Sequence, residues 1–378
     1  MKYFSRLQPA ESFLKTSGLI NFRRFRRSIY AMEMTNKIIL KGLNLAEIGE
    51  QMTAIGEKPF RAHQIYQWLY QKNVTDWARM SNIPQALREK LTERFIIQTI
   101  KLKDSFHSHR DGSIKYLFEL ADGHMIEAVY MPEEPRRTVC LSSQVGCPVG
   151  CAFCATGIMG LIRNLTAGEI VDQLLFINAA LTRPITNVVF MGMGEPFFNY
   201  DNVIRAAQIF NSELGPELAA RRITISTCGI IPAIERFTAE KQRYKLAISL
   251  NATTDEQRDK LILINRKYKI AELLTAARHY TRTTRKHVTF EYILMAGIND
   301  TLADARRLVT LLSPIPCKLN LIPYNENPQF PFRAPTEEHL NEFIHEIYRA
   351  PFAVTVRRSK GLDIAAACGQ LYVAARKS

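Results

Sequence analysis

Along the second half of the chain, the hydrophobic and polar positions alternate between two kinds of pattern. Apolar residues recur at spacings of three and four in stretches such as GEIVDQLLFINAAL and IAELLTAARHY, which predicts amphipathic helices. Between such stretches lie short apolar runs typical of buried strands: TVCLSSQ, NVVFMGM, RITIST, KLAISLN, HVTFEYILM and KLNLIPY. This alternation predicts an α/β fold with parallel strands. Its six units are fewer than a closed barrel needs, so we expect a partial (β/α)6 barrel over residues 136–378.

The stretch before the barrel divides into two parts. Residues 38–100 contain three helical segments separated by Pro or Gly, which predicts a small N-terminal helical domain. Residues 101–135 predict a linker and a β-hairpin, because apolar and polar positions alternate on both sides of Asp122-Gly123. The polar side of the middle helix reads as a solvated face, with RNA contact as the alternative: Arg61, His63, Gln64 and Gln67.

The chain is strongly basic. Its 378 residues contain 50 Lys and Arg against 36 Asp and Glu, which gives a formal charge of +14 and a pI near 9.5. This balance favours a polyanionic partner, with nucleic acid first and a merely soluble basic surface as the alternative. Residues 1–37 are arginine-rich without apolar periodicity, so we read them as a disordered basic arm. A mis-assigned start, at Met32 or Met34, and an organelle-targeting peptide are the other readings.

Composition and cysteine use indicate a soluble globular protein. Hydrophobic residues make up 47% of the chain, yet no apolar run reaches the ~18 to 20 residues that a membrane span needs. Seven cysteines without a secretory signal fit a reducing compartment. We therefore expect a cytoplasmic protein without a membrane partner.

Three cysteines, Cys147, Cys151 and Cys154, lie within the run CPVGCAFC. Their spacing supplies three thiolates to a 4Fe-4S cluster and leaves one iron open to activate a substrate, which favours catalysis over electron transfer alone. Zinc would need a further cysteine or histidine pair, and three thiols this close cannot pair off as disulfides. Phe153 places an aromatic ring where an adenine can stack. The arrangement resembles the radical S-adenosyl-L-methionine (SAM) superfamily.

Further motifs narrow the resemblance. In chain order they are VCLSSQVGCPVGCAFCATG, FMGMGEP, ITISTCG, AISLN, LIPYN and DIAAACGQL. Together they resemble the RlmN/Cfr family of radical SAM RNA methyltransferases over residues 38 to about 375. The resemblance implies a 4Fe-4S cluster, two SAM molecules per turnover, and RNA binding by the N-terminal helical domain. It also implies an electron donor such as flavodoxin or ferredoxin. One complete site per chain predicts a monomer.

The motifs follow the carboxyl ends of the predicted strands, where parallel α/β folds hold their ligands. In Gly194-Glu195 the glycine permits close approach of the backbone, and the carboxylate suits the ammonium group of SAM. The resemblance implies further SAM contacts from an aromatic ring and from polar side chains: Phe153, Ser226, Ser249, Asn251 and Asn325. Each of these polar residues, taken alone, is more often a strand-end cap than a ligand.

Two cysteines outside the cluster motif complete the implied chemistry. The resemblance implies that one SAM methylates Cys368 and that a radical made from a second SAM activates this methyl group for attack on adenine. Cys140 then resolves the protein–RNA adduct by thiol exchange. Glu127 matches the family's proton acceptor, with a solvated strand glutamate as an equal reading. Cys228 and Cys317 match no catalytic position and are read as packing residues.

Five basic residues are expected beside the active-site face as phosphate contacts: Arg221, Arg222, Arg357, Arg358 and Lys360. The predicted function is methylation of carbon 2 of adenine in 23S rRNA and also in tRNA, with the target nucleotide taken out of its stack. The alternatives are carbon-8 methylation of the same rRNA adenine, a radical SAM enzyme with another substrate, and a non-catalytic iron-sulfur sensor that binds RNA.

Overall fold

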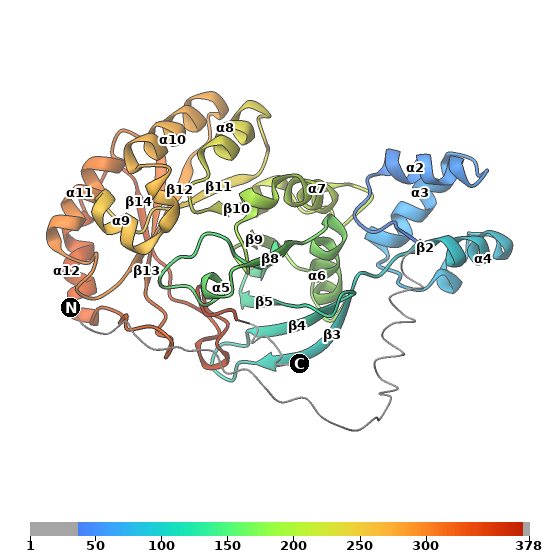
Figure 1. Cartoon of the computed structure of the whole chain (residues 1–378), viewed down its shortest axis with the longest axis horizontal. Helices are drawn as coiled ribbons and strands as arrows, with labels where there is room; N and C mark the ends of the chain where they lie inside the picture. Colours follow the sequence, from blue (N-terminus) through green and yellow to red (C-terminus); the bar gives the residue numbers. More distant parts are fainter. Residues whose placement is uncertain (1–36, 373–378) are drawn as a thin grey trace, which may run out of the picture. The chain divides into compact units, whose positions relative to one another are not determined.

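One sheet of ten strands forms the centre of the molecule (Figure 1). The computed structural model describes residues 37–372, so the expected basic arm, apart from Lys37, and residues 373–378 lie outside the described residues. The barrel part of the sheet consists of parallel strands: β6 (Arg136–Cys140), β9 (Asn187–Phe190), β10 (Ile223–Thr227), β11 (Lys245–Ser249), β12 (Val288–Leu294), β13 (Cys317–Pro323) and β14 (Ala353–Val356). The six predicted strands and the partial α/β barrel are therefore confirmed.

The seventh parallel strand, β14, was not predicted. Its run AVTV is four residues long and pairs with the edge of β13. It follows α12 (Glu337–Ile347), which begins where the hydroxyl of Thr336 accepts a hydrogen bond from the backbone N–H of His339. So short a strand carries little periodic signal of its own, and it forms because β13 offers an unpaired edge.

Helices connect the parallel strands and cover the outer side of the sheet (Figure 1). They are α6 (Ala167–Ala179), α7 (Tyr200–Asn211), α8 (Ile231–Ala239), α10 (Ile270–Thr284) and α11 (Leu302–Leu312). The short α9 (Asp255–Leu261) instead packs against the loop after β6, where the N–H of Ala152 donates to the carbonyl of Leu261 (3.0 Å). A capping box begins α6: the Thr166 hydroxyl accepts from the N–H of Glu169, and the Glu169 carboxylate accepts from the N–H of Thr166. A cap of this kind stabilises a helix by about 1 kcal/mol. Between residues 37 and 372 no helix is long and apolar enough to cross a membrane.

A small helical domain precedes the sheet. Its elements are β1 (Ile38–Ile39), α2 (Leu45–Ala54), α3 (Phe60–Tyr66), η1 (Gln67–Gln71), η2 (Trp77–Arg79), α4 (Gln85–Arg94) and β2 (Phe95–Ile96). A buried ion pair between Nζ of Lys41 and the carboxylate of Asp172 (3.2 Å) joins this domain to α6. The backbone of Gly42, with φ of +96°, approaches Gly168 so closely that a Cβ would lie 2.4 Å from the Gly168 nitrogen. The helical domain is thus fixed against the first barrel helix.

The predicted hairpin forms as β4 (Ile114–Leu120) and β5 (Met125–Glu133) around Asp122 and Gly123. A third antiparallel strand, β3 (Ile100–His107), pairs with β4. On the other side β5 pairs with β6, where Val129 lies opposite Cys140. The hairpin therefore continues the barrel sheet, which places the second hairpin strand directly beside the strand that ends at Cys140.

Candidate active site

The loop after β6 brings the three cysteines of the CPVGCAFC run to one cavity. Short elements shape this loop: β7 (Gln144–Gly146), α5 (Ala155–Ile158) and β8 (Leu161–Asn164). Cys147, Cys151 and Cys154 all line the cavity, which encloses about 800 Å³ of empty space. Among the described residues no three His, Cys, Asp or Glu side chains converge on a single metal ion, whereas a 4Fe-4S cluster binds each cysteine through a different iron. Three thiols around one cavity fit such a cluster.

A fourth cysteine packs against this trio. The Sγ atom of Cys228 lies 3.9 Å from the Sγ atom of Cys151, and Cys228 also lines the cavity. Cys228 therefore packs at the wall of the cavity and Cys317 packs in the core, both as expected. Burial raises the pKa of Cys147, so this thiol keeps its proton until a metal ion binds it as the thiolate.

The turn after β9 carries Gly194 and Glu195 into the same cavity. Gly194 has a φ of +99°, and a Cβ here would lie 2.6 Å from the Cβ of Gln144, so only glycine fits. Glu195 is 2% exposed, and its carboxylate accepts hydrogen bonds from the backbone N–H groups of Phe197 (3.0 Å) and Cys228 (2.7 Å). Burial raises the pKa of Glu195. Among the described residues no cation pairs with this carboxylate. An ammonium group bound in the cavity would supply that positive charge.

Hydrogen bonds connect this turn to the cysteine loop. The backbone N–H of Glu195 donates to Oε1 of Gln144 (2.8 Å), and Nε2 of Gln144 donates to Oδ1 of Asn164 (2.7 Å). Asn199 donates from its Nδ2 to the carbonyl of Ser143 (2.8 Å). These bonds hold both sides of the cavity in a fixed geometry, as an active site requires.

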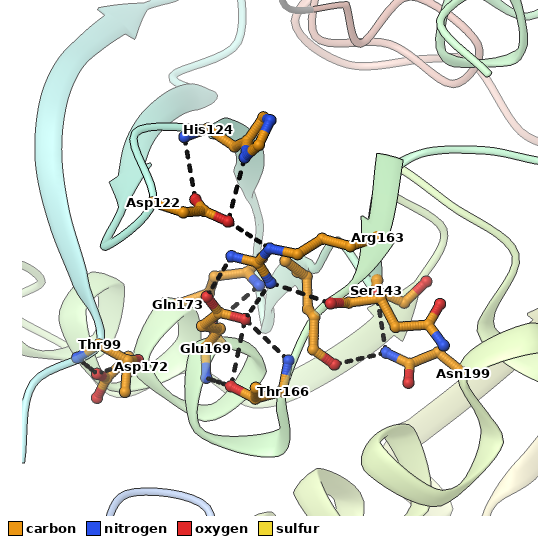
Figure 2. A network of polar contacts seen from close by, with 12 residues as sticks. Thr99, Asp122, His124, Ser143, Arg163, Thr166, Glu169, Asp172, Gln173 and Asn199 are labelled. Atoms are coloured by element: carbon orange, nitrogen blue, oxygen red, sulfur yellow. Dashed lines mark hydrogen bonds and ion pairs between the residues drawn. The ribbon is translucent and has the colours of Figure 1, made fainter. Parts of the chain in front are cut away.

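Arg163 extends the network to the hairpin and to α6 (Figure 2). Its guanidinium donates two hydrogen bonds to the carboxylate of Glu169, at 2.7 and 2.9 Å, and a third to Asp122 in the hairpin turn. Although burial opposes it, Arg163 lowers the pKa of Asp122 to about 2. The hairpin, β8 and α6 are therefore linked by charge-assisted bonds at the edge of the cysteine loop.

Four of the other expected SAM contacts line the cavity: Phe153, Ser226, Ser249 and Asn251. The two serines lie in β10 and at the end of β11, in agreement with the rule that ligands bind at carboxyl ends. The side-chain oxygen of Asn251 accepts a hydrogen bond from the N–H of Ile293 (2.8 Å), so this residue also supports β12.

Cys368 lies between two cavities. It lines the cavity of the cluster cysteines and also a second one of about 470 Å³, which Cys140, Arg357 and Lys360 line as well. Asn325 lines neither cavity. Its Nδ2 donates to the carbonyl of Cys368 (3.0 Å), so it positions the segment that carries this thiol. The end of β6 and the C-terminal segment thus bring the two expected catalytic cysteines to one chamber.

Cys140 is buried and Cys368 is partly buried. Burial raises the pKa of Cys140 to about 11 and the pKa of Cys368 to about 12. The guanidinium of Arg357 opposes the shift at each of them. Arg357 is therefore a cation placed to stabilise their thiolates.

Glu127 is 3% exposed and lines neither cavity, so the reading as a solvated strand glutamate is wrong. Its carboxylate forms an ion pair with Nζ of Lys115 (3.1 Å) and accepts a hydrogen bond from the N–H of Tyr372 (3.0 Å). Lys115 also donates to the carbonyl of Ala365 (3.3 Å). Burial raises the pKa of Glu127, against the effect of Lys115. The pair ties the hairpin to the C-terminal segment that carries Cys368.

The sequence patterns missed Glu291, in the middle of β12. It lines the larger cavity, it is 4% exposed, and its Oε1 has no hydrogen-bond partner among the described residues. Nη1 of Arg357 lies 3.9 Å from that oxygen. Burial raises the pKa of Glu291. Only the alternation of β12, read with its register to β11, places this side chain on the cavity face.

The basic residues expected beside the site separate into two groups. Arg357 and Lys360 line the smaller cavity, and the guanidinium of Arg358 is engaged by the carboxylate of Glu337 (2.7 and 2.8 Å). Arg221 and Arg222 end η4 (Ala220–Arg222), just before β10. They therefore lie at the amino end of β10. The cavity lies at the carboxyl ends of the strands, where this fold binds its ligands, so these two arginines are at the opposite end. The expectation that these two flank the active-site face is wrong.

Comparison with known proteins agrees with this geometry. Residues 38–97 match the ribosomal RNA large subunit methyltransferase N-terminal domain, and residues 141–309 match the radical SAM superfamily. The chain is 47% identical over 338 residues to a dual-specificity RNA methyltransferase RlmN of Geobacter sulfurreducens, covering 89% of this chain and 93% of that protein. It is also 47% identical to the enzyme of the same name from an Anaeromyxobacter species, over 88% of this chain and 90% of the relative.

A solved structure extends the likeness to the fold. The crystal structure of a radical SAM methyltransferase from Sphaerobacter thermophilus superposes with a TM-score of 0.86 at 44% sequence identity, over 88% of this chain and 99% of that one. Membership of the radical SAM superfamily implies a 4Fe-4S cluster and SAM, and the cavity lined by the three thiols and Glu195 fits both groups. The chain belongs to the RlmN family of radical SAM RNA methyltransferases.

Proposed function

We propose that this enzyme methylates carbon 2 of adenine in 23S rRNA and in tRNA, and that it uses two SAM molecules per turnover. The observation that supports this most is the position of Cys368 between two cavities. One cavity holds the cluster cysteines and Glu195, and the other holds Cys140 and Arg357. A residue that accepts a methyl group from one ligand and passes its carbon to another has to face both of them.

Cys368 acts twice in the proposed reaction. Its thiolate, stabilised by Arg357, attacks the methyl group of the first SAM, so that a sulfur–carbon bond forms and S-adenosylhomocysteine leaves. When bound, the 4Fe-4S cluster supplies the electron that splits the second SAM into methionine and a 5′-deoxyadenosyl radical. The methyl group on Cys368 then gives up a hydrogen atom to this radical, which becomes 5′-deoxyadenosine, and the remaining carbon bonds to the adenine ring.

Release of the RNA needs a base and a second thiol. The ring carbon gives up its proton, and the one electron that the adduct loses would return to the oxidised cluster held by Cys147, Cys151 and Cys154. Glu127 is the proposed proton acceptor: its carboxylate accepts a hydrogen bond from the N–H of Tyr372, next to the segment that carries Cys368, and burial raises its pKa, which makes it a stronger base. The Cys140 thiolate attacks Sγ of Cys368, which forms a disulfide and breaks the sulfur–carbon bond to the RNA. Protonation of the released carbon completes the methyl group, and a thiol reductant restores both cysteines.

The proposed partners follow from the same reaction. The electron comes from a reduced donor such as flavodoxin or ferredoxin, and we propose that the enzyme acts as a monomer in the cytoplasm. A single chain carries every residue named in the two cavities, which supports the monomer.

Nucleoside mass spectrometry tests the proposal. Cluster-loaded protein, SAM and a reductant are incubated without oxygen with unmodified 23S rRNA or tRNA, which are then digested. We expect 2-methyladenosine from both RNAs. Finding 8-methyladenosine alone would assign the methylation to carbon 8. Formation of 5′-deoxyadenosine without methylated RNA would indicate another substrate. If neither 5′-deoxyadenosine nor methylated RNA formed, the iron-sulfur sensor would be the remaining function.

A further inference from the structure

The inward-facing side chains of the barrel change character from one end of the strands to the other. Ser249 and Glu291 lie side by side on neighbouring strands and both line the larger cavity. Because side chains alternate along a strand, every second residue toward the amino end shares this face. On β11 this sequence ends at Lys245, and on β13 the same face carries Lys318.

Hydroxyl and amide groups occupy the level between these two ends. By the same registers, most inward-facing residues below the cavity are polar and at least partly exposed: Thr138, Asn187, Thr224, Thr289, Asn320 and Thr355. Ala247 and Val189 are the apolar exceptions on this face. A closed barrel would fill this level with branched apolar side chains. The polar level opens onto cations at the amino ends of the strands.

Five exposed cations gather there: Arg136, Arg221, Arg222, Lys245 and Lys318. Burial lowers the pKa of Lys245, and so does the positive charge of the other four, which shows that they lie within electrostatic reach of it. Only Arg136 has an acidic partner, Glu133 at 3.0 Å. The other four form no ion pair with any carboxylate in residues 37–372. We call these five residues the basal cluster.

We propose that the basal cluster is a second RNA-binding surface, which holds backbone phosphates of the substrate RNA at the end of the barrel opposite to the reacting adenine. The proposal rests on the proposed function for the identity of the polyanion. Guanidinium and ammonium groups donate hydrogen bonds and accept none, so the unpaired donors of this surface suit phosphate oxygens. Each bound phosphate also relieves the mutual repulsion that lowers the pKa of Lys245.

The dimensions allow one RNA to reach both ends. The five residues of β11 span roughly 17 Å at about 3.3 Å per residue, whereas one turn of a nucleic-acid duplex spans about 34 Å. A structured RNA can therefore place a loop nucleotide at the carboxyl ends and a flanking helix at the basal cluster. An acidic electron donor fits this surface poorly, because the cluster cysteines lie beyond the opposite ends of the strands.

The test compares three double variants with the parent enzyme, the third being the charge-conserving Lys245→Arg/Lys318→Arg. Lys245→Ala/Lys318→Ala removes two unpaired charges from the basal cluster. Arg236→Ala/Arg306→Ala removes two charges that are already paired on the helices, with Asp201 and Glu346. The dissociation constant of a 23S rRNA fragment and of tRNA is measured over a series of KCl concentrations for each protein.

We expect the basal variant to bind both RNAs on the order of 10-fold more weakly, with a salt slope lower by about 1.5, which is roughly 0.7 to 0.9 for each lost phosphate contact. The helix variant should keep the parent slope, and Lys245→Arg/Lys318→Arg should restore it. The iron content and the formation of 5′-deoxyadenosine without RNA should match the parent in every variant.

An unchanged slope in the basal variant would overturn the inference. Normal RNA binding together with slower reduction by flavodoxin would overturn it as well, in favour of a donor-docking surface. If the parent enzyme bound neither RNA, the proposed function would fail. If the parent and the basal variant bound RNA equally well, only the inference about the basal cluster would fail, so the two failures can be told apart.

Discussion

At the scale of single residues, Gly194 is a position in the cavity wall where the backbone leaves no room for a side chain. A Cβ there meets Gln144 at 2.6 Å on a backbone with φ of +99°. We expect Gly194→Ala to push the Glu195 turn out of place, to weaken SAM binding at least 10-fold, and to cost about 1–3 kcal/mol of stability from backbone strain. Isothermal titration of cluster-loaded protein with SAM measures the first effect, and urea unfolding measures the second.

Gly123→Ala is the matched control. Gly123 has a φ of +84°, but a Cβ there has no atom within 4 Å. This variant should lose about 1–2 kcal/mol from the left-handed backbone alone and bind SAM as the parent does. Equal loss of SAM binding in the two variants would show that the close approach to Gln144 does not position the carboxylate.

Cys140 and Cys368 have separable roles if the proposed chemistry holds. Cys140→Ala leaves the methylation of Cys368 and the attack on adenine intact but removes the thiol that breaks the sulfur–carbon bond. We expect covalent protein–RNA adduct to accumulate at about one RNA per active chain. Denaturing gels before and after nuclease digestion reveal it. Cys317→Ala, at a buried cysteine outside both cavities, should release its product. Free methylated RNA from Cys140→Ala would contradict the assigned role.

At the scale of elements, one buried charge pair joins the helical domain to α6. Nζ of Lys41 lies 3.2 Å from Asp172 on α6, with the lysine side chain fully buried and the aspartate 6% exposed. Asp172→Asn leaves the ammonium group without a counter-charge, and breaking a buried pair in this way costs about 3–5 kcal/mol. We expect chemical denaturation to show this loss, or an early transition of the helical domain alone.

An exposed pair supplies the comparison. Asp201 is 79% exposed and lies 2.6 Å from Arg236. Asp201→Asn should change the free energy of unfolding by less than about 1 kcal/mol, since surface ion pairs contribute little. Equal effects of the two asparagine variants would mean that the Lys41–Asp172 pair does not hold the domain to α6.

The elements that the sequence predicted are those with a repeating pattern. Six strands, the hairpin around Asp122-Gly123 and the capped helices follow from local periodicity and cap chemistry. The site cysteines follow from their spacing. Three features could not be predicted from the sequence, because strand register and tertiary packing determine them. They are the four-residue strand β14, the position of Glu291 at the cavity, and the approach of Cys228 to Cys151. The misplacement of Arg221 and Arg222 has another origin: Arg222 begins the predicted strand RITIST and Arg221 precedes it, so the chain direction alone already places them at its amino end.

At the scale of the whole molecule, the buried thiols make stability depend on pH. Burial raises the pKa of Cys140 in the folded protein to about 11 from an ordinary value near 9. As pH rises from 9, the unfolded chain loses this proton first, so the folded state becomes less favourable. The contribution of a raised pKa is therefore fully present below pH 9 and is lost as pH rises to about 11.

The cluster-free protein offers a clean measurement of this dependence. Each such thiol should reduce the free energy of unfolding by about 1.4 kcal/mol per pH unit between pH 9 and 11. Cys140→Ala should therefore show a shallower decline than the parent by that amount, whatever its stability at neutral pH. Urea unfolding at pH 8, 9, 10 and 11 gives both slopes. If the free energies of unfolding of the parent and of Cys140→Ala declined in parallel, the thiol of Cys140 would have the same pKa in the folded and unfolded chains. The chamber between Cys140 and Cys368 would then be open enough for water to solvate a thiolate without help from Arg357.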